Sequence, residues 1–185
     1  MLNLSIREPE VDVLVGLLTA SKPELLDGGE DRTLRTLLHD YFAFARNLEE
    51  ARAKFASYIG LSPTQYMILI LLAHSPQDEP LGINQIADRL HLSGAFVTIE
   101  VNKLVAEDLV HKSGHPTDGR RVQLVVTEEG LNRLKRLAAF QRPVNDALFG
   151  MLSHDEFGQL SRLLAKLAAN GEKAVKLAGY IEATR

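Results

Sequence analysis

Two adjacent arginines, Arg120 and Arg121, end a polar stretch that could bind an anion. The stretch contains Asp118-Gly119, a dipeptide typical of a chain reversal. Guanidinium groups beside such a turn can bind phosphate oxygens or enter a narrow minor groove. We therefore expect Arg120 and Arg121 to contact a nucleic-acid backbone, with Asp118 orienting the loop and His115 adding a contact when it is protonated. The alternative is an ordinary solvated turn.

Two short helices are predicted upstream of this loop. The first spans residues 83–90, and the second begins after a turn formed by residues 90–93. Gly82 is a tolerated N-cap for the first helix, and Ser93 is a good N-cap for the second. Two helices joined in this way form a helix-turn-helix, and in DNA-binding examples the second helix enters the major groove. The residues expected to face DNA here are Ser93, Gly94, Ala95, Thr98, Asn102 and Lys103.

The second helix separates into two predicted faces. Asn can pair with adenine, and Thr can touch a thymine methyl group or a phosphate. Gly94 and Ala95 in the first turn would let backbone amides approach a phosphate. The apolar residues recur near a helical repeat and are expected to form the buried face: Phe96, Val97, Val101, Leu104 and Val105. The alternative for the polar residues is a solvated outer face.

A hairpin follows the second helix. Residues 109–112 and 122–126 are short segments rich in β-formers, and turn-forming residues separate them. Helix-turn-helix followed by a basic hairpin is a winged helix. The predicted fold class is therefore mainly α with a small β-wing.

From Leu61 to Gly130 the chain resembles the MarR family of bacterial transcriptional regulators. The likeness rests on the order and spacing of short motifs, and the flanking helices extend it to roughly residues 32–170. The motifs are Leu61-Ser62-Pro63-Thr64-Gln65-Tyr66, Ile86-Ala87-Asp88-Arg89-Leu90, Leu92-Ser93, Val97-Thr98, Lys103-Leu104, Leu109-Val110, Asp118-Gly119-Arg120-Arg121 and Val126-Thr127-Glu128-Glu129-Gly130. The resemblance implies a homodimeric repressor or activator, often released from DNA by a small ligand.

The chain departs from the family pattern at three positions. Ile99 stands where the family usually has a basic residue, and Phe96 stands where a small hydroxyl residue is common. Asp108 replaces the usual glycine before Leu109-Val110. The second helix therefore offers few base-reading donors.

An effector pocket between the long helices and the winged helix is also implied by the resemblance. Its candidate lining residues are Tyr41, Arg46 and Tyr66. Each of them could equally be a core or surface residue. The sequence does not identify the ligand.

Composition limits the other functions. The chain has 185 residues, a length that suits one domain or one domain with an oligomerisation extension. Its net charge of −3 is well short of the strongly basic balance expected of a dedicated DNA-binding domain. The formal charges within residues 92–121 sum to zero, so attraction to DNA must depend on how the charged side chains are arranged. No cysteine is present, and the six histidines lack metal-ligand spacing. We expect no metal, no cofactor and no enzymatic activity.

Long helices are predicted on both sides of the winged helix. Apolar residues recur on one face from Asp31 for about 28 residues, or ~40 Å of helix, up to Gly60. After the wing, Thr127 and Ser153 are predicted N-caps of two helices, the first kinked by Pro143. Gly171 is expected to interrupt the second, leaving a final helix to about residue 181.

The predicted organisation has four parts. Residues 1–30 form an N-terminal extension, in which Pro9 can start a short helix, and residues 31–60 form a dimerisation helix. Residues 61–127 form the winged helix-turn-helix, and residues 128–185 form C-terminal dimerisation helices. Apolar faces that a small unit cannot cover favour self-association.

We expect a sequence-specific DNA-binding transcriptional regulator, a repressor, that acts as a homodimer on a pseudo-palindromic operator. Its half-sites would lie ~34–36 Å apart. No signal peptide or membrane span is evident, so the expected location is the cytoplasm. The alternative is a winged-helix module for protein–protein assembly without direct DNA readout.

Overall fold

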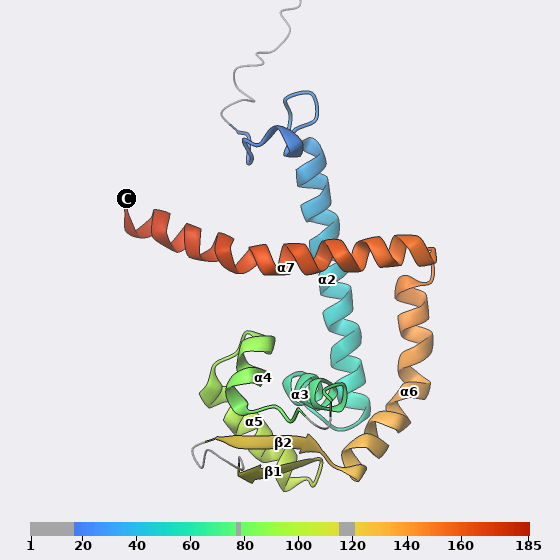
Figure 1. The fold of residues 1–185 in the computed structure, drawn as a ribbon. Coiled ribbons are helices and arrows are strands. Elements are labelled where there is room, and N and C mark those ends of the chain that lie inside the picture. The colour runs from blue at the N-terminus through green and yellow to red at the C-terminus, as the bar shows by residue number, and fades with distance from the viewer. Residues whose placement is uncertain (1–16, 77–78, 115–120) are drawn as a thin grey trace, which may run out of the picture. The chain divides into compact units, whose positions relative to one another are not determined.

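The computed structural model describes residues 17–76, 79–114 and 121–185. Within them it is mainly helical and contains a two-stranded antiparallel sheet, which confirms the predicted fold class (Figure 1). The elements are η1 (Pro23–Leu25), α2 (Arg32–Tyr58), α3 (Pro63–Ala73), α4 (Ile83–Leu90), α5 (Gly94–Ala106), β1 (Val110–Gly114), β2 (Val122–Val126), α6 (Glu128–Phe149) and α7 (His154–Ala183). None of the described helices, taken alone, has both the length and the apolar composition of a membrane span. The helices α2 and α3 meet both criteria only when they are counted together as one bent pair.

The chain divides into two compact units, residues 1–51 and 52–185. In the first unit, Asp31 is fully buried just before α2. Its carboxylate accepts hydrogen bonds from the Thr19 amide at 2.7 Å and the Thr19 hydroxyl at 2.6 Å, and it pairs with Arg35 at 2.9 Å. The bonds from Thr19 lower the pKa of the Asp31 carboxyl. These contacts fasten the preceding loop to the helix. The short helix predicted at Pro9 falls outside the described residues.

The core of the second unit is built around α3. Ser62 and Gln65 cap this helix reciprocally: the Ser62 amide donates to the Gln65 side chain at 2.9 Å, and the Gln65 amide donates to the Ser62 hydroxyl at 3.2 Å. The predicted capping box is therefore confirmed. Ile68, Leu69 and Leu72 are buried, so α3 is the central helix that its uniformly apolar sequence predicted.

The wing sheet is fixed by its pairing register. Val110 lies opposite Val126, and Gly114 lies opposite Val122, so β1 extends two residues beyond its predicted end. The Leu124 amide also donates to the Leu81 carbonyl at 2.9 Å, which ties β2 to the chain before α4. This hydrogen bond, in addition to the pairing of β1 with β2, connects the wing to the helix-turn-helix.

Gly130 shows why the start of α6 needs a glycine. A Cβ added at Gly130 would collide with the backbone carbonyl of Leu109 and lie 2.7 Å from a methyl group of Val126. A larger residue would therefore push α6 away from the wing. Thr127 caps the helix, as predicted, by accepting from the Gly130 amide at 3.0 Å.

The prediction that Gly171 ends a helix is wrong. The helix α7 runs through Gly171 as one element of 30 residues. A glycine costs about 1 kcal/mol in a helix interior, and the strong helix formers on both sides outweigh that cost. The helix α6 likewise continues through Pro143, and its ribbon bends along its length (Figure 1). No residue of α7 is buried.

Candidate nucleic-acid interface

The predicted helix-turn-helix is formed by α4, α5 and the turn that joins them. His91 ends α4 in the left-handed conformation, with φ of 53°, and the Leu92 amide donates back to the Ala87 carbonyl at 2.9 Å. Ser93 then caps α5 by accepting from the Phe96 amide at 3.3 Å. The turn thus satisfies backbone groups on both sides, which holds the two helices in a defined orientation.

One face of α5 is packed into the core. Val97, Val101 and Leu104 are completely buried, and Glu100 is nearly so. The helix contacts α3, α4 and β1 through this face. The opposite face is left for solvent or a partner.

Phe96 does not belong to the buried face, contrary to the prediction. Its side chain is 41% exposed, and Ile99, one turn further on, is 53% exposed. Successive residues of a helix point about 100° apart, so a residue beside Val97 points well away from the direction of the core. The exposed surface of α5 therefore carries an aromatic and an aliphatic side chain.

The polar residues predicted on α5 are partly engaged within the chain. The Thr98 hydroxyl donates to the Gly94 carbonyl at 2.8 Å. Lys103 pairs with Glu100 at 2.7 Å, and the other carboxylate oxygen of Glu100 is buried with no hydrogen-bond partner in the described part of the chain. Lys112 donates to the Asn102 side-chain carbonyl at 3.2 Å, which leaves the Asn102 amide group for other contacts.

A hollow of about 330 Å³ joins the start of α4, one side of α5 and the base of the wing. It brings together Thr98, Lys112 and Arg121, which lie on three different segments. Its lining residues are Gly82, Ile83, Asn84, Gln85, Thr98, Lys112, Arg121 and Val122. Two cations beside a helix N-terminus are suited to binding phosphate oxygens.

Lys112 is not among the residues that the sequence predicted to bind DNA. The signal was available, because Lys112 follows the buried Val110 by two positions and alternate residues of a strand face the same side. That side faces α5, where Lys112 meets Asn102. Of the residues predicted on the wing, Arg121 is exposed, whereas His115, Asp118 and Arg120 fall outside the described residues.

The residues predicted to bind an effector occupy different surroundings. Tyr66 is only 4% exposed; its ring meets Phe55 edge-on, and its hydroxyl accepts a hydrogen bond from Gln141 at 3.1 Å. Burial raises the pKa of the Tyr66 hydroxyl. Tyr41 and Arg46 are exposed on the part of α2 that belongs to the first unit.

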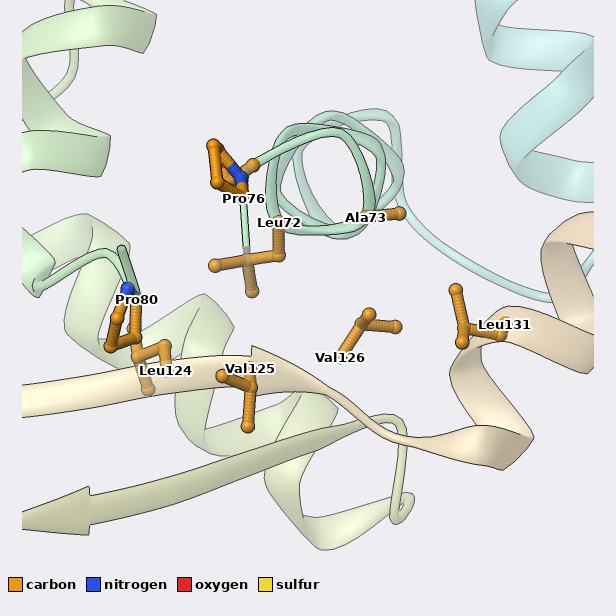
Figure 2. A pocket seen from close by; sticks show the side chains of 9 residues that line it. Leu72, Ala73, Pro76, Pro80, Leu124, Val125, Val126 and Leu131 are labelled. Atoms are coloured by element: carbon orange, nitrogen blue, oxygen red, sulfur yellow. The ribbon is translucent and has the colours of Figure 1, made fainter. Parts of the chain in front are cut away.

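A separate cavity of about 340 Å³ lies within the second unit, between the end of α3, strand β2 and the start of α6 (Figure 2). Its lining is mostly aliphatic, and the side chains of Leu72, Val126 and Leu131 surround the shared space in Figure 2. Such a cavity could take a small group that has both apolar and polar atoms. None of the three predicted effector residues lines it.

Comparison with known proteins gives consistent results. The family model described as MarR family matches residues 59–121. The HTH-type transcriptional regulator MhqR of Bacillus subtilis (strain 168) is 28% identical over 128 residues, which cover 69% of this chain and 86% of MhqR. The HTH-type transcriptional repressor MdtR of the same strain is 26% identical over 113 residues, which cover 61% of this chain and 71% of MdtR.

Solved structures share the fold. AbsC, a MarR family transcriptional regulator from Streptomyces coelicolor, superposes with a TM-score of 0.67 at 20% identity, over 77% of this chain and 96% of AbsC. Sco3205, another MarR family regulator from that organism, was solved in complex with DNA. It superposes with a TM-score of 0.65 at 22% identity, over 74% of this chain and 89% of Sco3205.

Proposed function

Because the chain belongs to the MarR family of transcriptional regulators, we propose that it is a homodimeric repressor of a pseudo-palindromic DNA operator. The observation that carries this proposal is the meeting of Thr98, Lys112 and Arg121 in one hollow beside the exposed face of α5. In that arrangement α5 lies in the major groove, while Lys112 and Arg121 bind the flanking phosphates. The protein acts in the cytoplasm, where a bacterial operator is accessible.

The dimer is proposed because the terminal helices expose large apolar side chains. On α7 these include Leu163, Leu164 and Leu167, and on α2 they include Leu37 and Phe42. A second copy of the chain would cover such faces. Two α5 helices related by a two-fold axis would read half-sites ~34–36 Å apart.

Pairing also addresses the weak local charge. Residues 92–121 carry as many formal negative as positive charges, so their net charge does not attract DNA and only suitably placed cations can do so. Two copies double the number of cations that reach the same duplex. The affinity for DNA would then depend on where these cations lie relative to the phosphates, as well as on the salt concentration.

We further propose that a small molecule releases the protein from DNA. A ligand can do so only if it prefers one spacing of the two α5 helices, since equal affinity for both spacings shifts nothing. Tyr41, Arg46 and Tyr66 remain the candidate contacts. The cavity of Figure 2 is a second candidate, because it touches β2 and α6 together.

The experiment is to select genomic fragments bound by the full-length protein and to measure their affinity across a salt series. We expect a pseudo-palindromic site whose affinity falls steeply with salt, with a slope of about −0.9 per phosphate contact. Arg120→Ala or Arg121→Ala should weaken binding and flatten this slope. Arg162→Ala, which removes an exposed guanidinium from α7, is the matched control and should leave binding unchanged. Parent-like binding by both wing variants would remove the wing from the mechanism.

The second candidate function is a protein–protein assembly module. The exposed apolar side chains of Phe96 and Ile99 favour it, because apolar surface is common at protein interfaces. It requires that the full-length protein retain no duplex at low salt. Recovery of an enriched site excludes it as the main function.

A further inference from the structure

The surface that α5 offers to a partner combines two apolar side chains with a small residue. Phe96 and Ile99 are exposed and stand one helical turn apart, and the exposed Ala95 lies next to them in the first turn. The core needs neither side chain, since Val97, Val101 and Leu104 already fill the buried face. An explanation for Phe96 and Ile99 must therefore be sought outside the core of this unit.

The hydrogen-bonding groups near these two side chains are less available. The Thr98 hydroxyl is bonded to the Gly94 carbonyl, and Lys103 is held by the buried Glu100. The Asn102 carbonyl accepts from Lys112, so only the amide group of that side chain stays available as a donor. In the described part of α5, contact with a base edge is thus weighted toward apolar surface rather than toward donors.

Only one base presents an apolar group in the major groove. Thymine carries a C5-methyl group there, and cytosine has a hydrogen at the same position. Apolar side chains distinguish the two by burying that methyl group. An apolar pair on a helix in the major groove would therefore favour thymine at the base positions that the two side chains contact.

We propose that Phe96 and Ile99 read thymine methyl groups, so that the preferred operator half-site carries thymines opposite the first two turns of α5. This inference rests on the proposed function, since it requires α5 to lie in the major groove. It assigns base discrimination to the exposed apolar pair. The cations Lys112 and Arg121 hold the phosphates whatever the sequence.

The test removes only the methyl groups. A duplex selected by the full-length protein is synthesised with thymine and again with deoxyuridine at every thymine, and both forms are titrated at one salt concentration. We expect the deoxyuridine duplex to bind about fourfold more weakly for each methyl group in contact, the factor expected for burying one methyl-sized group. Substitution at single positions then locates the contacts.

Variants connect that effect to the two side chains. Phe96→Ala and Ile99→Ala should bind the two duplexes with more nearly equal affinity, and circular dichroism should show both variants folded, because neither side chain is in the core. Arg121→Ala should weaken binding to both duplexes by the same factor. Met151→Ala, which removes an exposed apolar side chain outside α5, should keep the parental ratio.

The outcomes separate the inference from the proposed function. Equal affinity of the parent for both duplexes, or an unchanged ratio in both the Phe96→Ala and Ile99→Ala variants, overturns the inference while DNA binding stands. Failure to recover any duplex, even at low salt, overturns both. A loss of discrimination confined to these two variants supports the inference.

Discussion

The helices α5 and α7 use their apolar residues in opposite ways. In α5, four of 13 residues are buried, and the core holds the helix from one side. In α7, none of 30 residues is buried, although Leu163, Leu167 and Ile181 recur along it. Both belong to the same compact unit, so the difference lies in what each helix packs against.

This difference indicates where each helix obtains its stability. The helix α5 is positioned by contacts with α3, α4 and β1, so its outer face is free for a function. Isolated helices are marginal in water, and most helical stability in proteins comes from packing of an apolar face. The packing partner of α7 must therefore come largely from outside the unit of residues 52–185, and a second copy is the proposed one.

A charge in the apolar stripe of α7 gives the largest expected effect. We expect Leu167→Glu to convert the proposed dimer to a monomer, because it places a carboxylate in the surface that a second copy is proposed to cover. Losing the second α5 from the same duplex should lower operator affinity by about 10²–10⁴-fold. Analytical ultracentrifugation gives the mass, and titration of the operator gives the affinity.

The matched control is Ala169→Glu. It adds the same charge two positions away, about 200° around the helix and therefore close to the opposite face. It should remain dimeric and bind DNA as the parent does. Dimeric Leu167→Glu, or equal disruption by both variants, would remove α7 from the proposed interface.

Truncation of one leucine in each helix sharpens the comparison. Leu104→Ala in α5 should lower the free energy of unfolding by about 3 kcal/mol, since it leaves a cavity at a fully buried position. Leu163→Ala in α7 should act mainly through the dimer, so its effect should change with protein concentration. Urea denaturation at two concentrations measures both. If the effect of Leu163→Ala is independent of concentration, α7 is stabilised within its own chain.

Local patterns explain why much of this fold was predictable. Ser62, Thr127 and Ser153 cap helices within three residues of their own position, and the two short helices of the winged helix follow from a local apolar repeat. The features that were not predicted depend on packing between elements or on the surrounding helix. The exposure of Phe96 depends on how α5 is rotated against its neighbours, and the continuity of α7 through Gly171 depends on the helix on both sides.

The candidate site was predictable in the same uneven way. The polar residues of α5 were identified from type and spacing, yet their internal bonds were not. Lys103 is paired with Glu100 because a buried carboxylate requires a counterion, which becomes evident only once the burial of Glu100 is known. The joining of Lys112 and Arg121 with Thr98 likewise required the strand register and the path of the chain before α4.

Neutralising the buried acid of α5 should produce a smaller effect, and a gain. We expect Glu100→Gln to raise operator affinity by a factor of about 1.4 to 5, because Lys103 is then free to approach a phosphate. This factor corresponds to the ~0.2–1 kcal/mol of a partly exposed ion pair. Glu107→Gln is the control, since Glu107 pairs with Arg133 on α6 instead. Titration of the operator measures both variants. Equal gains in both would indicate a general charge effect rather than the release of Lys103.

The smallest expected effect concerns the start of α7. The Glu156 carboxylate accepts from the Ser153 amide at 2.8 Å and from its hydroxyl at 2.7 Å, and these bonds lower the pKa of Glu156. A pKa lowered by folding stabilises the folded state above the unfolded-state pKa, about 4.3, and this contribution is lost as the pH falls through the folded-state value. Carboxyl NMR should show Ser153→Ala moving the Glu156 pKa back toward that reference, whereas Ser161→Ala, further along the same helix, should not. Because the cap needs only local contacts, the shift should persist in monomeric Leu167→Glu; its disappearance there would mean that the partner helps to form even the first turn of α7.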